Sequence, residues 1–195
     1  MNSDDATRRV MDVLGELGIP YMLVGSLSSG FYGVARSTKD ADFVVQLEGA
    51  SVASIAGQLG DEFRLDPQVQ FETVTATTRY VIDVPSIRFH VELFRLSDDP
   101  HDQERFSRRR EVHVSRFKCD AFLPTAEDVI ITKLRWAVAG ERGKDAEDVG
   151  HVIAVQGDAI DWDYVYGWCA QHGTRERLDQ IRAAIPPIDD SDGDQ

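Results

Sequence analysis

The first third of the chain carries two kinds of hydrophobic spacing, one typical of helices and one typical of strands. Apolar residues recur every three or four positions between residues 6 and 17, and Gly18 follows as a stop signal, so this segment predicts an amphipathic helix. The unbroken apolar run 21–24 predicts a strand that is buried on both faces. A short helix over 26–32, a strand over 42–47 and a helix over 52–59 follow.

Beyond residue 70 the sequence first favours strands and then helices. Val, Thr, Tyr, Ile and Phe dominate residues 70–96, around a turn at 83–86, and predict two or three strands. Residues 105–110 form a basic loop or short helix, and 112–117 is again β-like. Helices are predicted near 126–139, 144–156, 161–172 and 174–184. The resulting fold class is α+β, with a mixed β-sheet flanked by helices and followed by a C-terminal helical part.

The length of 195 residues favours one domain over two full domains. We expect a core with the mixed sheet over residues 1–123 and the helical part over 124–185. Residues 186–195 contain four aspartates and almost nothing apolar, so we expect a disordered acidic tail there.

The charge balance narrows the classes of partner. The chain has 34 acidic and 21 basic residues and a formal net charge of −13. A broad nucleic-acid surface needs a positive field, so this charge argues against one. The two cysteines, Cys119 and Cys169, lie outside any disulfide or zinc spacing. Because no signal peptide or membrane-spanning apolar run is present, we expect a cytoplasmic protein without membrane contact.

Two carboxylates at the start of a strand are the first candidates for chemistry. Asp40 and Asp42 lie two positions apart, so the twofold period of a strand points both side chains to one side, about 7 Å apart. Like charges so placed raise each other's pKa unless a cation neutralises them, and Mg²⁺ prefers such oxygen ligands. The alternative is that both face solvent, because Asp is common just before strands.

A candidate phosphate site lies upstream of these acids. Gly25 and Ser26 end the buried strand and open the short helix. Backbone N–H groups at a helix start, together with the helix dipole, form a site for phosphate oxygens, and Ser26 adds a hydroxyl. An anion site beside a metal site is what phosphoryl or nucleotidyl transfer requires.

Three further polar residues could complete such a site. Glu92 shares a strand face with His90 and is the candidate third acid, or else an exposed strand glutamate. Lys133 lies on an apolar helical stripe and either contacts phosphate or extends its ammonium to solvent. Asp145 lies in a first helical turn, where acids are favoured by the dipole without any catalytic role.

A run of basic residues stands out against the acidic chain. Arginines and a lysine recur between residues 105 and 118. They would either grip the phosphates of an acceptor such as an RNA end, or form an ordinary solvated loop.

The order of these motifs resembles a known superfamily. Gly25-Ser26, then Asp40-Ala41-Asp42, then Glu92 is similar to the motif of the nucleotidyltransferase (DNA polymerase β-like) superfamily, and implies its fold. Within it, residues 32–42, Lys133-Leu134 and 144–148 resemble the AbiEii-like group, which includes the MenT-like toxins of bacterial toxin–antitoxin systems. The likeness covers residues from about 20 to about 150.

The resemblance implies roles for individual residues. Gly25 and Ser26 would hold the phosphates of an NTP. Asp40 and Asp42 would bind Mg²⁺, and Lys133 would contact the triphosphate.

Two other positions relate to the same motifs. Asp145 matches an acid of the second motif that helps the reaction by orienting or deprotonating the acceptor. At the position of the third acid this chain has Glu92, whereas the superfamily usually has Asp. Whether the chain holds one or two Mg²⁺ ions depends on whether Glu92 takes that role.

The activity implied is transfer of a nucleoside monophosphate from an NTP to an acceptor hydroxyl, with release of pyrophosphate. By resemblance the acceptor is tRNA or another RNA, a protein side chain, or a small molecule such as an aminoglycoside. A toxin would also bind a cognate antitoxin. The alternative from another class is a catalytically silent nucleotide-binding module, because a fold alone does not guarantee chemistry.

Overall fold

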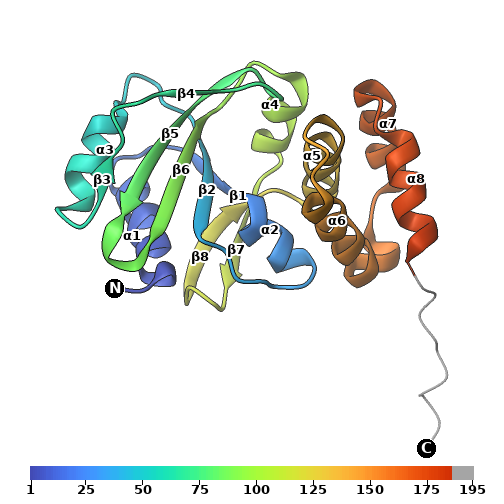
Figure 1. The fold of residues 1–195 in the computed structure, drawn as a ribbon, viewed down its shortest axis with the longest axis horizontal. Coiled ribbons are helices and arrows are strands. Elements are labelled where there is room, and N and C mark those ends of the chain that lie inside the picture. The colour runs from blue at the N-terminus through green and yellow to red at the C-terminus, as the bar shows by residue number, and fades with distance from the viewer. Residues whose placement is uncertain (186–195) are drawn as a thin grey trace, which may run out of the picture.

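The computed structural model describes residues 1–185, and the strands precede the last four helices (Figure 1). The first helices are α1 (Ser3–Glu16), α2 (Gly25–Tyr32), α3 (Val52–Leu59) and α4 (Pro100–Ser107). The strands are β1 (Tyr21–Val24), β2 (Asp40–Val45), β3 (Arg64–Leu65), β4 (Gln70–Glu72), β5 (Thr77–Val84), β6 (Phe89–Arg95), β7 (Arg110–Val114) and β8 (Cys119–Leu123). The last helices are α5 (Ala126–Ala139), α6 (Gly143–Gln156), α7 (Trp162–His172) and α8 (Arg175–Ala184).

Six strands form one mixed sheet in the order β1-β2-β6-β5-β3, and β4 also pairs with β5. Strands β2 and β6 run parallel, whereas the other pairs are antiparallel. The mixed sheet predicted from the sequence is therefore confirmed. The register places Asp42 beside Glu92, so two of the candidate acids lie on neighbouring strands. Strands β7 and β8 form a separate two-stranded sheet.

The two faces of the sheet differ chemically because side chains alternate along each strand. On β2, Ala41, Phe43 and Val45 are buried in a hydrophobic cluster with residues of α1 and α3. Asp40 and Asp42 alternate with them and are only partly buried. One face of the sheet is therefore apolar core, and the other carries these acids beside a smaller apolar cluster of Met22, Val24, Val44 and Phe106.

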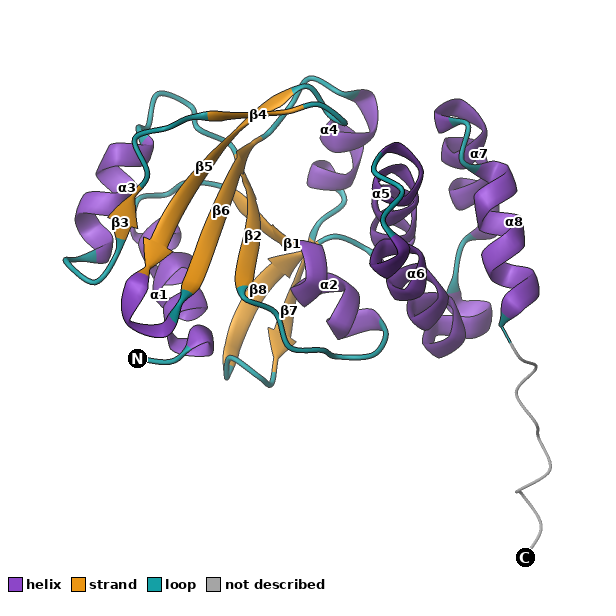
Figure 2. Ribbon diagram, in the orientation of Figure 1, coloured by secondary structure: helices purple, strands orange, loops and turns teal. Residues whose placement is uncertain are grey.

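The four C-terminal helices lie together beside the sheet-bearing part (Figure 2), and their side chains form a second hydrophobic cluster. Its fully buried members include Ile130 and Leu134 on α5, Val149 on α6 and Leu178 on α8. Helices α5 and α6 lie next to the sheet-bearing part, where α2 contacts both of them, and α7 and α8 lie beyond (Figure 1). Within residues 1–185, none of the helices is both long and apolar enough to cross a membrane.

Gly33 allows the end of α2 to approach the backbone of α6. A Cβ atom at this position would lie 2.9 Å from the backbone nitrogen of Val152, a contact that only glycine avoids. Gln156 Nε2 donates to the carbonyl of Tyr32 at 2.7 Å, and the Tyr32 hydroxyl donates to the carbonyl of Pro124 at 2.8 Å. These contacts fix α2 against the helical part.

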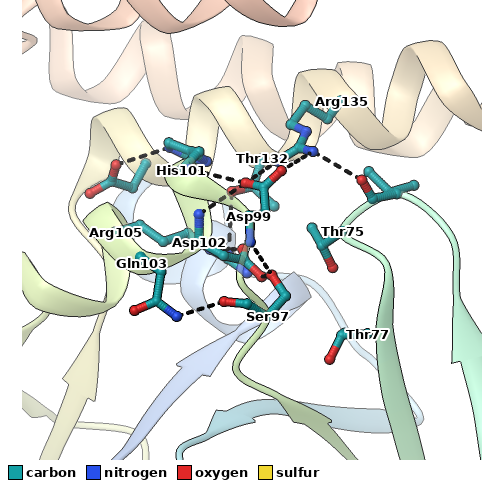
Figure 3. A network of polar contacts seen from close by, with 12 residues as sticks. Thr75, Thr77, Ser97, Asp99, His101, Asp102, Gln103, Arg105, Thr132 and Arg135 are labelled. Atoms are coloured by element: carbon teal, nitrogen blue, oxygen red, sulfur yellow. Dashed lines mark hydrogen bonds and ion pairs between the residues drawn. The ribbon is translucent and has the colours of Figure 1, made fainter.

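Polar contacts around α4 join the sheet-bearing part to α5 (Figure 3). Arg135 on α5 donates to both carboxylate oxygens of Asp99 at 3.0 and 2.8 Å, and to the carbonyl of Val74 at 2.9 Å. Arg105 Nε donates to Asp102 Oδ1 at 2.7 Å within α4. An unpaired buried charge reduces the stability of the fold. These pairings therefore allow charged groups to lie between the sheet-bearing part and α5.

Asp128 is a fully buried carboxylate in the first turn of α5. Its Oδ1 accepts from the Tyr164 hydroxyl at 2.8 Å and lies 3.2 Å from Nε2 of His101. Its Oδ2 accepts from Thr125 Oγ1 at 2.9 Å and from Arg108 Nε at 3.3 Å. Burial raises the pKa of Asp128, but the hydrogen bonds from His101 and Tyr164 outweigh burial and hold it below its usual value. One side chain thus joins α4, α5 and α7.

Most predicted elements begin and end within three residues of the observed ones. The prediction was wrong in the region that follows β6. Residues 105–110 do not form one segment, because they divide between the end of α4 and the start of β7. Strand β8 was not predicted. The start of α4 had a readable signal, since Asp99 caps the helix and Pro100 occupies its first turn. The predicted tail over 186–195 lies outside the described residues.

We expect Asp128→Ala to lower the free energy of unfolding by about 3–5 kcal/mol, because it removes the shared partner of α4, α7 and the N-cap of α5. Urea unfolding followed by circular dichroism measures this change. Asp120→Ala is the control, since Asp120 is exposed and pairs only with His113 among the described ion pairs. It should remain within about 0.5 kcal/mol of the wild type. Equal effects of the two substitutions would contradict the role of Asp128.

Candidate active site

A cavity of about 200 Å³ lies between the polar face of the sheet, the start of α2, and helices α5 and α6. Its lining includes Gly25, Ser26, Asp40, Asp42, Glu92, Lys133, Arg142, Lys144 and Asp145, and its other polar members are Ser28, Glu72, Thr75, Arg79, Asp102, Arg105 and Thr132. All the site residues that the sequence predicts are in this set, although they come from five different elements. The structure therefore brings the predicted residues to one place.

Gly25 lies directly against one of the acids. Its φ of +66° is in the left-handed region, and a Cβ atom there would lie 1.9 Å from Oδ2 of Asp42. Both the backbone conformation and the close approach require glycine. The start of α2 is therefore in immediate contact with a carboxylate of β2.

The N-terminus of α2 is a candidate anion site. Its N-cap residue, Val24, makes no side-chain hydrogen bond to the N–H groups of the first turn. Such N–H groups and the helix dipole favour a negatively charged oxygen. Ser26 places a hydroxyl in the lining of the same cavity. This end of α2 can therefore hold phosphate oxygens.

The acids on β2 and β6 carry uncompensated negative charge. Burial, followed by the charges of Glu92 and Asp40, raises the pKa of Asp42 from 3.8 to about 7. Lys133 and Arg142 act in the opposite direction but do not cancel this effect. Oxygen ligands with unbalanced charge are those that Mg²⁺ prefers, so the chemistry of Asp40 and Asp42 fits a divalent cation.

Glu92 is held by an arginine of the neighbouring strand. Arg79 Nη1 donates to Glu92 Oε2 at 2.9 Å, and the other Nη donates to Gln70. Within the described part of the chain, no group of three His, Cys, Asp or Glu side chains is placed to hold a metal ion. A role for Glu92 as the third metal ligand therefore stays a prediction.

Lys133 is buried between two carboxylates of α6. Its Nζ lies 2.8 Å from Asp145 Oδ1 and 2.9 Å from Asp148 Oδ2. Arg142 Nε lies 3.0 Å from Asp145 Oδ2. The alternative that Lys133 extends to bulk solvent is wrong, because the residue is only 8% exposed. Asp145 thus contacts two cations, which sequence reasoning did not foresee.

Arg36 and Asp148 belong to the site, although sequence reasoning did not select them. Arg36 Nε and Nη2 donate to the two carboxylate oxygens of Asp148 at 3.1 and 3.3 Å, and Nη2 lies 2.5 Å from Ser26 Oγ. Burial raises the pKa of Asp148, but hydrogen bonds from Arg36 and Lys133 outweigh it and hold the pKa below its usual value. Both residues stand in the segments 32–42 and 144–148 that resemble the AbiEii-like group, and the three-residue spacing from Asp145 puts both acids on one helical face.

The basic segment 105–118 does not form a phosphate-binding patch of free arginines. Four of its side chains contact other residues of the chain: Arg105 pairs with Asp102, Arg108 with Asp128 and Arg116 with Asp4, and Arg109 lies over the ring of Phe106. These four arginines therefore already have partners within the chain, although Arg105 also lines the active-site cavity, and the expected contact with acceptor phosphates stays a prediction.

Solved structures share the fold of this chain. Its mixed sheet flanked by helices is similar to that of structures described as a nucleotidyltransferase and an adenylyltransferase, so the chain has the nucleotidyltransferase fold. No family model and no curated protein matches the sequence.

The similar structures include two of the antibiotic-resistance factor ANT(2'')-Ia. Its solution structure has a TM-score of 0.61 at 13% identity, over 92% of this chain and 96% of that chain. Its crystal structure with adenylyl-2''-tobramycin has a TM-score of 0.60 at 13% identity, over 89% and 98%.

Two further proteins share the fold at lower similarity. JHP933 from Helicobacter pylori has a TM-score of 0.51 at 14% identity, over 95% of this chain and 79% of that one. The lincosamide antibiotic adenylyltransferase LnuA, with lincomycin bound, has a TM-score of 0.50 at 9% identity, over 77% and 96%. At such identities the likeness is one of fold.

We expect Gly25→Ala to destabilise the protein by more than about 1 kcal/mol, because of the left-handed backbone and the contact with Asp42. Thermal unfolding measures the effect. Gly57→Ala in α3 is the control, since a Cβ there meets nothing within 4 Å. Adding Asp42→Ala to Gly25→Ala should recover part of the loss. If the double variant recovers none, the contact with Asp42 contributes nothing.

The raised pKa of Asp42 predicts an unusual pH dependence. Its protonated form stabilises the metal-free fold, and this stability is full below pH 3.8 and is lost as pH rises through about 7. In EDTA, Asp42→Asn should therefore gain more stability over the wild type at pH 8 than at pH 5, as measured by thermal unfolding. Mg²⁺ should stabilise the wild type more at pH 8 than at pH 6, because protons compete for the carboxylate. A difference between the two proteins that does not change with pH would refute the raised pKa.

Proposed function

We propose that this chain is a Mg²⁺-dependent nucleotidyltransferase that moves a nucleoside monophosphate from an NTP to an acceptor hydroxyl. The observation that supports this most is the contact between the start of α2 at Gly25 and the carboxylate of Asp42. It sets a phosphate site and a metal site side by side in one cavity, as nucleotidyl transfer requires.

Each residue of the cavity has a role in this proposal. The N-terminus of α2, with Gly25 and Ser26, holds phosphate oxygens of the NTP. Asp40 and Asp42 hold Mg²⁺, which when bound supplies positive charge to balance the triphosphate. Lys133 adds a fixed positive charge on the side of the cavity formed by α5.

The proposed reaction is a single displacement at phosphorus. The acceptor oxygen forms a bond to the α-phosphorus while the bond from that phosphorus to the pyrophosphate oxygen breaks. Pyrophosphate leaves, and the acceptor hydroxyl loses its proton to solvent. The work of the protein is to align the two oxygens and to balance charge, rather than to form a covalent intermediate.

Asp145 supports this reaction by holding Lys133. Its carboxylate oxygens lie 2.8 Å from Lys133 and 3.0 Å from Arg142, so both oxygens already contact cations of the chain. We therefore assign Asp145 to the positioning of Lys133 in preference to deprotonation of the acceptor.

For the acceptor we propose a small molecule with a hydroxyl group. Four arginines of segment 105–118 already contact other residues of the chain, and the formal net charge is −13, so binding of an RNA backbone has little support. The solved structures with the same fold hold adenylyl-2''-tobramycin and lincomycin. Transfer to tRNA, with an antitoxin as partner, is the second candidate, and it rests on the resemblance to the AbiEii-like group.

The proposed activity is testable with α-labelled NTPs. Each of the four NTPs is incubated with the protein, Mg²⁺, and an aminoglycoside, a lincosamide or total RNA, and labelled products are separated. We expect a labelled small molecule and pyrophosphate. Asp40→Asn should reduce transfer at least about a hundredfold, since loss of one charge-stabilising group typically costs that much in kcat.

Asp120→Asn, on the separate hairpin of β7 and β8, is the matched control and should retain activity. Labelled RNA in place of a labelled small molecule would overturn the proposed acceptor and favour the tRNA candidate. Binding of NTP without transfer to any acceptor would favour a silent nucleotide-binding module. Equal activity of Asp40→Asn and the wild type would refute the metal site.

A further inference from the structure

We infer that Arg36 is a positioning residue that orients the hydroxyl of Ser26 toward the nucleotide and links it to Lys133 through Asp148. The inference rests on the proposed function and deepens it, because it concerns how the same site grips an NTP. It comes from three contacts of one guanidinium between α2 and α6.

The contact with Arg36 restricts the direction of the Ser26 hydroxyl hydrogen. Arg36 Nη2 donates to Ser26 Oγ at 2.5 Å, so a lone pair of this oxygen is occupied by an incoming hydrogen bond. A guanidinium has no acceptor, so the Ser26 hydrogen cannot point back at Arg36. It is left to point elsewhere, and Ser26 lines the active-site cavity. A phosphate oxygen there would accept that hydrogen.

The neighbouring serines show that this arrangement is specific to Ser26. The hydroxyl of Ser28 donates to the carbonyl of Gly25 at 3.0 Å, and that of Ser29 donates to the carbonyl of Ser26 at 3.2 Å. Both hydrogens are thus used within α2, as is common for serine in a helix. Within residues 1–185, the Ser26 hydroxyl makes no such bond, because Ser26 is the second residue of α2 and no helical carbonyl lies three or four residues before it.

The Asp148 carboxylate is shared by two cations, Arg36 and Lys133. Asp148 is buried on α6, accepts from Arg36 at 3.1 and 3.3 Å, and lies 2.9 Å from Lys133 Nζ. It also accepts from Ser29 Oγ at 3.2 Å. Because one carboxylate binds both cations, the hydroxyl on α2 and the ammonium on α5 are placed relative to one anchor on α6.

The competing explanation is that the contacts of Arg36 only stabilise the loop after α2. In that case Arg36 would stabilise the fold, and its removal would weaken nucleotide binding independently of Ser26. The two explanations differ in their coupling: a positioning residue acts through the Ser26 hydroxyl, so its effect must vanish when that hydroxyl is absent.

A double-mutant cycle measures this coupling. Ser26→Ala, Arg36→Ala and the double variant are compared with the wild type in direct binding of the NTP that the wild type binds most tightly, with Mg²⁺ and without acceptor. We expect each single substitution to weaken binding about tenfold, as for loss of one hydrogen bond to a charged group. The double variant should bind about as weakly as either single variant, not a hundredfold more weakly than the wild type.

Two further variants control for general effects. Arg116→Ala removes an arginine of matched exposure, 37% against 35% for Arg36, from an ion pair with Asp4 that does not line the cavity. It should leave NTP binding unchanged. Arg36→Lys keeps the charge but has a single ammonium in place of the two nitrogens that reach Ser26 and Asp148, so it should not restore binding.

The outcomes separate this inference from the proposed function. If the wild type binds none of the four NTPs with Mg²⁺, the proposed function fails. If it binds one but the two substitutions multiply their effects, or Arg36→Lys restores binding in full, only the role of Arg36 is overturned. Arg36→Gln is made in parallel, and failure of both the Ala and Gln variants to fold would also count against the inference, since it would show a structural role.

Discussion

The cavity depends on acids of like charge that face it from two adjacent strands and that the protein only partly neutralises. Asp40, Asp42 and Glu92 lie on the polar face of the sheet, and burial and mutual repulsion keep the pKa of Asp42 near 7. Burying such a group reduces stability. The surrounding cations, with Arg79 on the sheet and Lys133 on α5 among them, follow from this constraint, because they offset part of the repulsion.

The same constraint explains why the helical part is needed. The sheet supplies acids and α2 supplies N–H groups, but Lys133, Arg142 and Lys144 come from the segment that follows the last strand. The close approach of Gly33 to α6 and the buried Asp128 dock that segment firmly. The separate hydrophobic cluster of α5 to α8 therefore has a role beyond its own stability, since it carries the positive wall of the cavity.

Local patterns in the sequence predicted the mixed sheet and the positions of Gly25, Ser26, Asp40 and Asp42, because a strand, a tight turn and a twofold period operate over few residues. Strand alternation and helical spacing made Glu92 and Lys133 candidates for the same site, whereas the role of Asp145 in the reaction was expected from the resemblance. The pairing of Arg36 with Asp148, which lie 112 positions apart, had no local signal. Likewise, the pairings of Arg108 with Asp128 and of Arg116 with Asp4 had no local signal, because these partners lie 20 and 112 positions away.

The site contains a row of alternating positive and negative side chains that responds unevenly to ionic strength. It runs from Ser26 through Arg36, Asp148, Lys133 and Asp145 to Arg142. The inner members are almost inaccessible, whereas the side chains of Arg36 and Arg142 at the two ends are 35% and 39% exposed. Dissolved ions screen exposed charges over about 8 Å at physiological salt and buried ones far less. Added salt should therefore weaken the contacts at the two ends of the row first, between Arg36 and Ser26 and between Arg142 and Asp145. The buried Lys133 ammonium should keep its position.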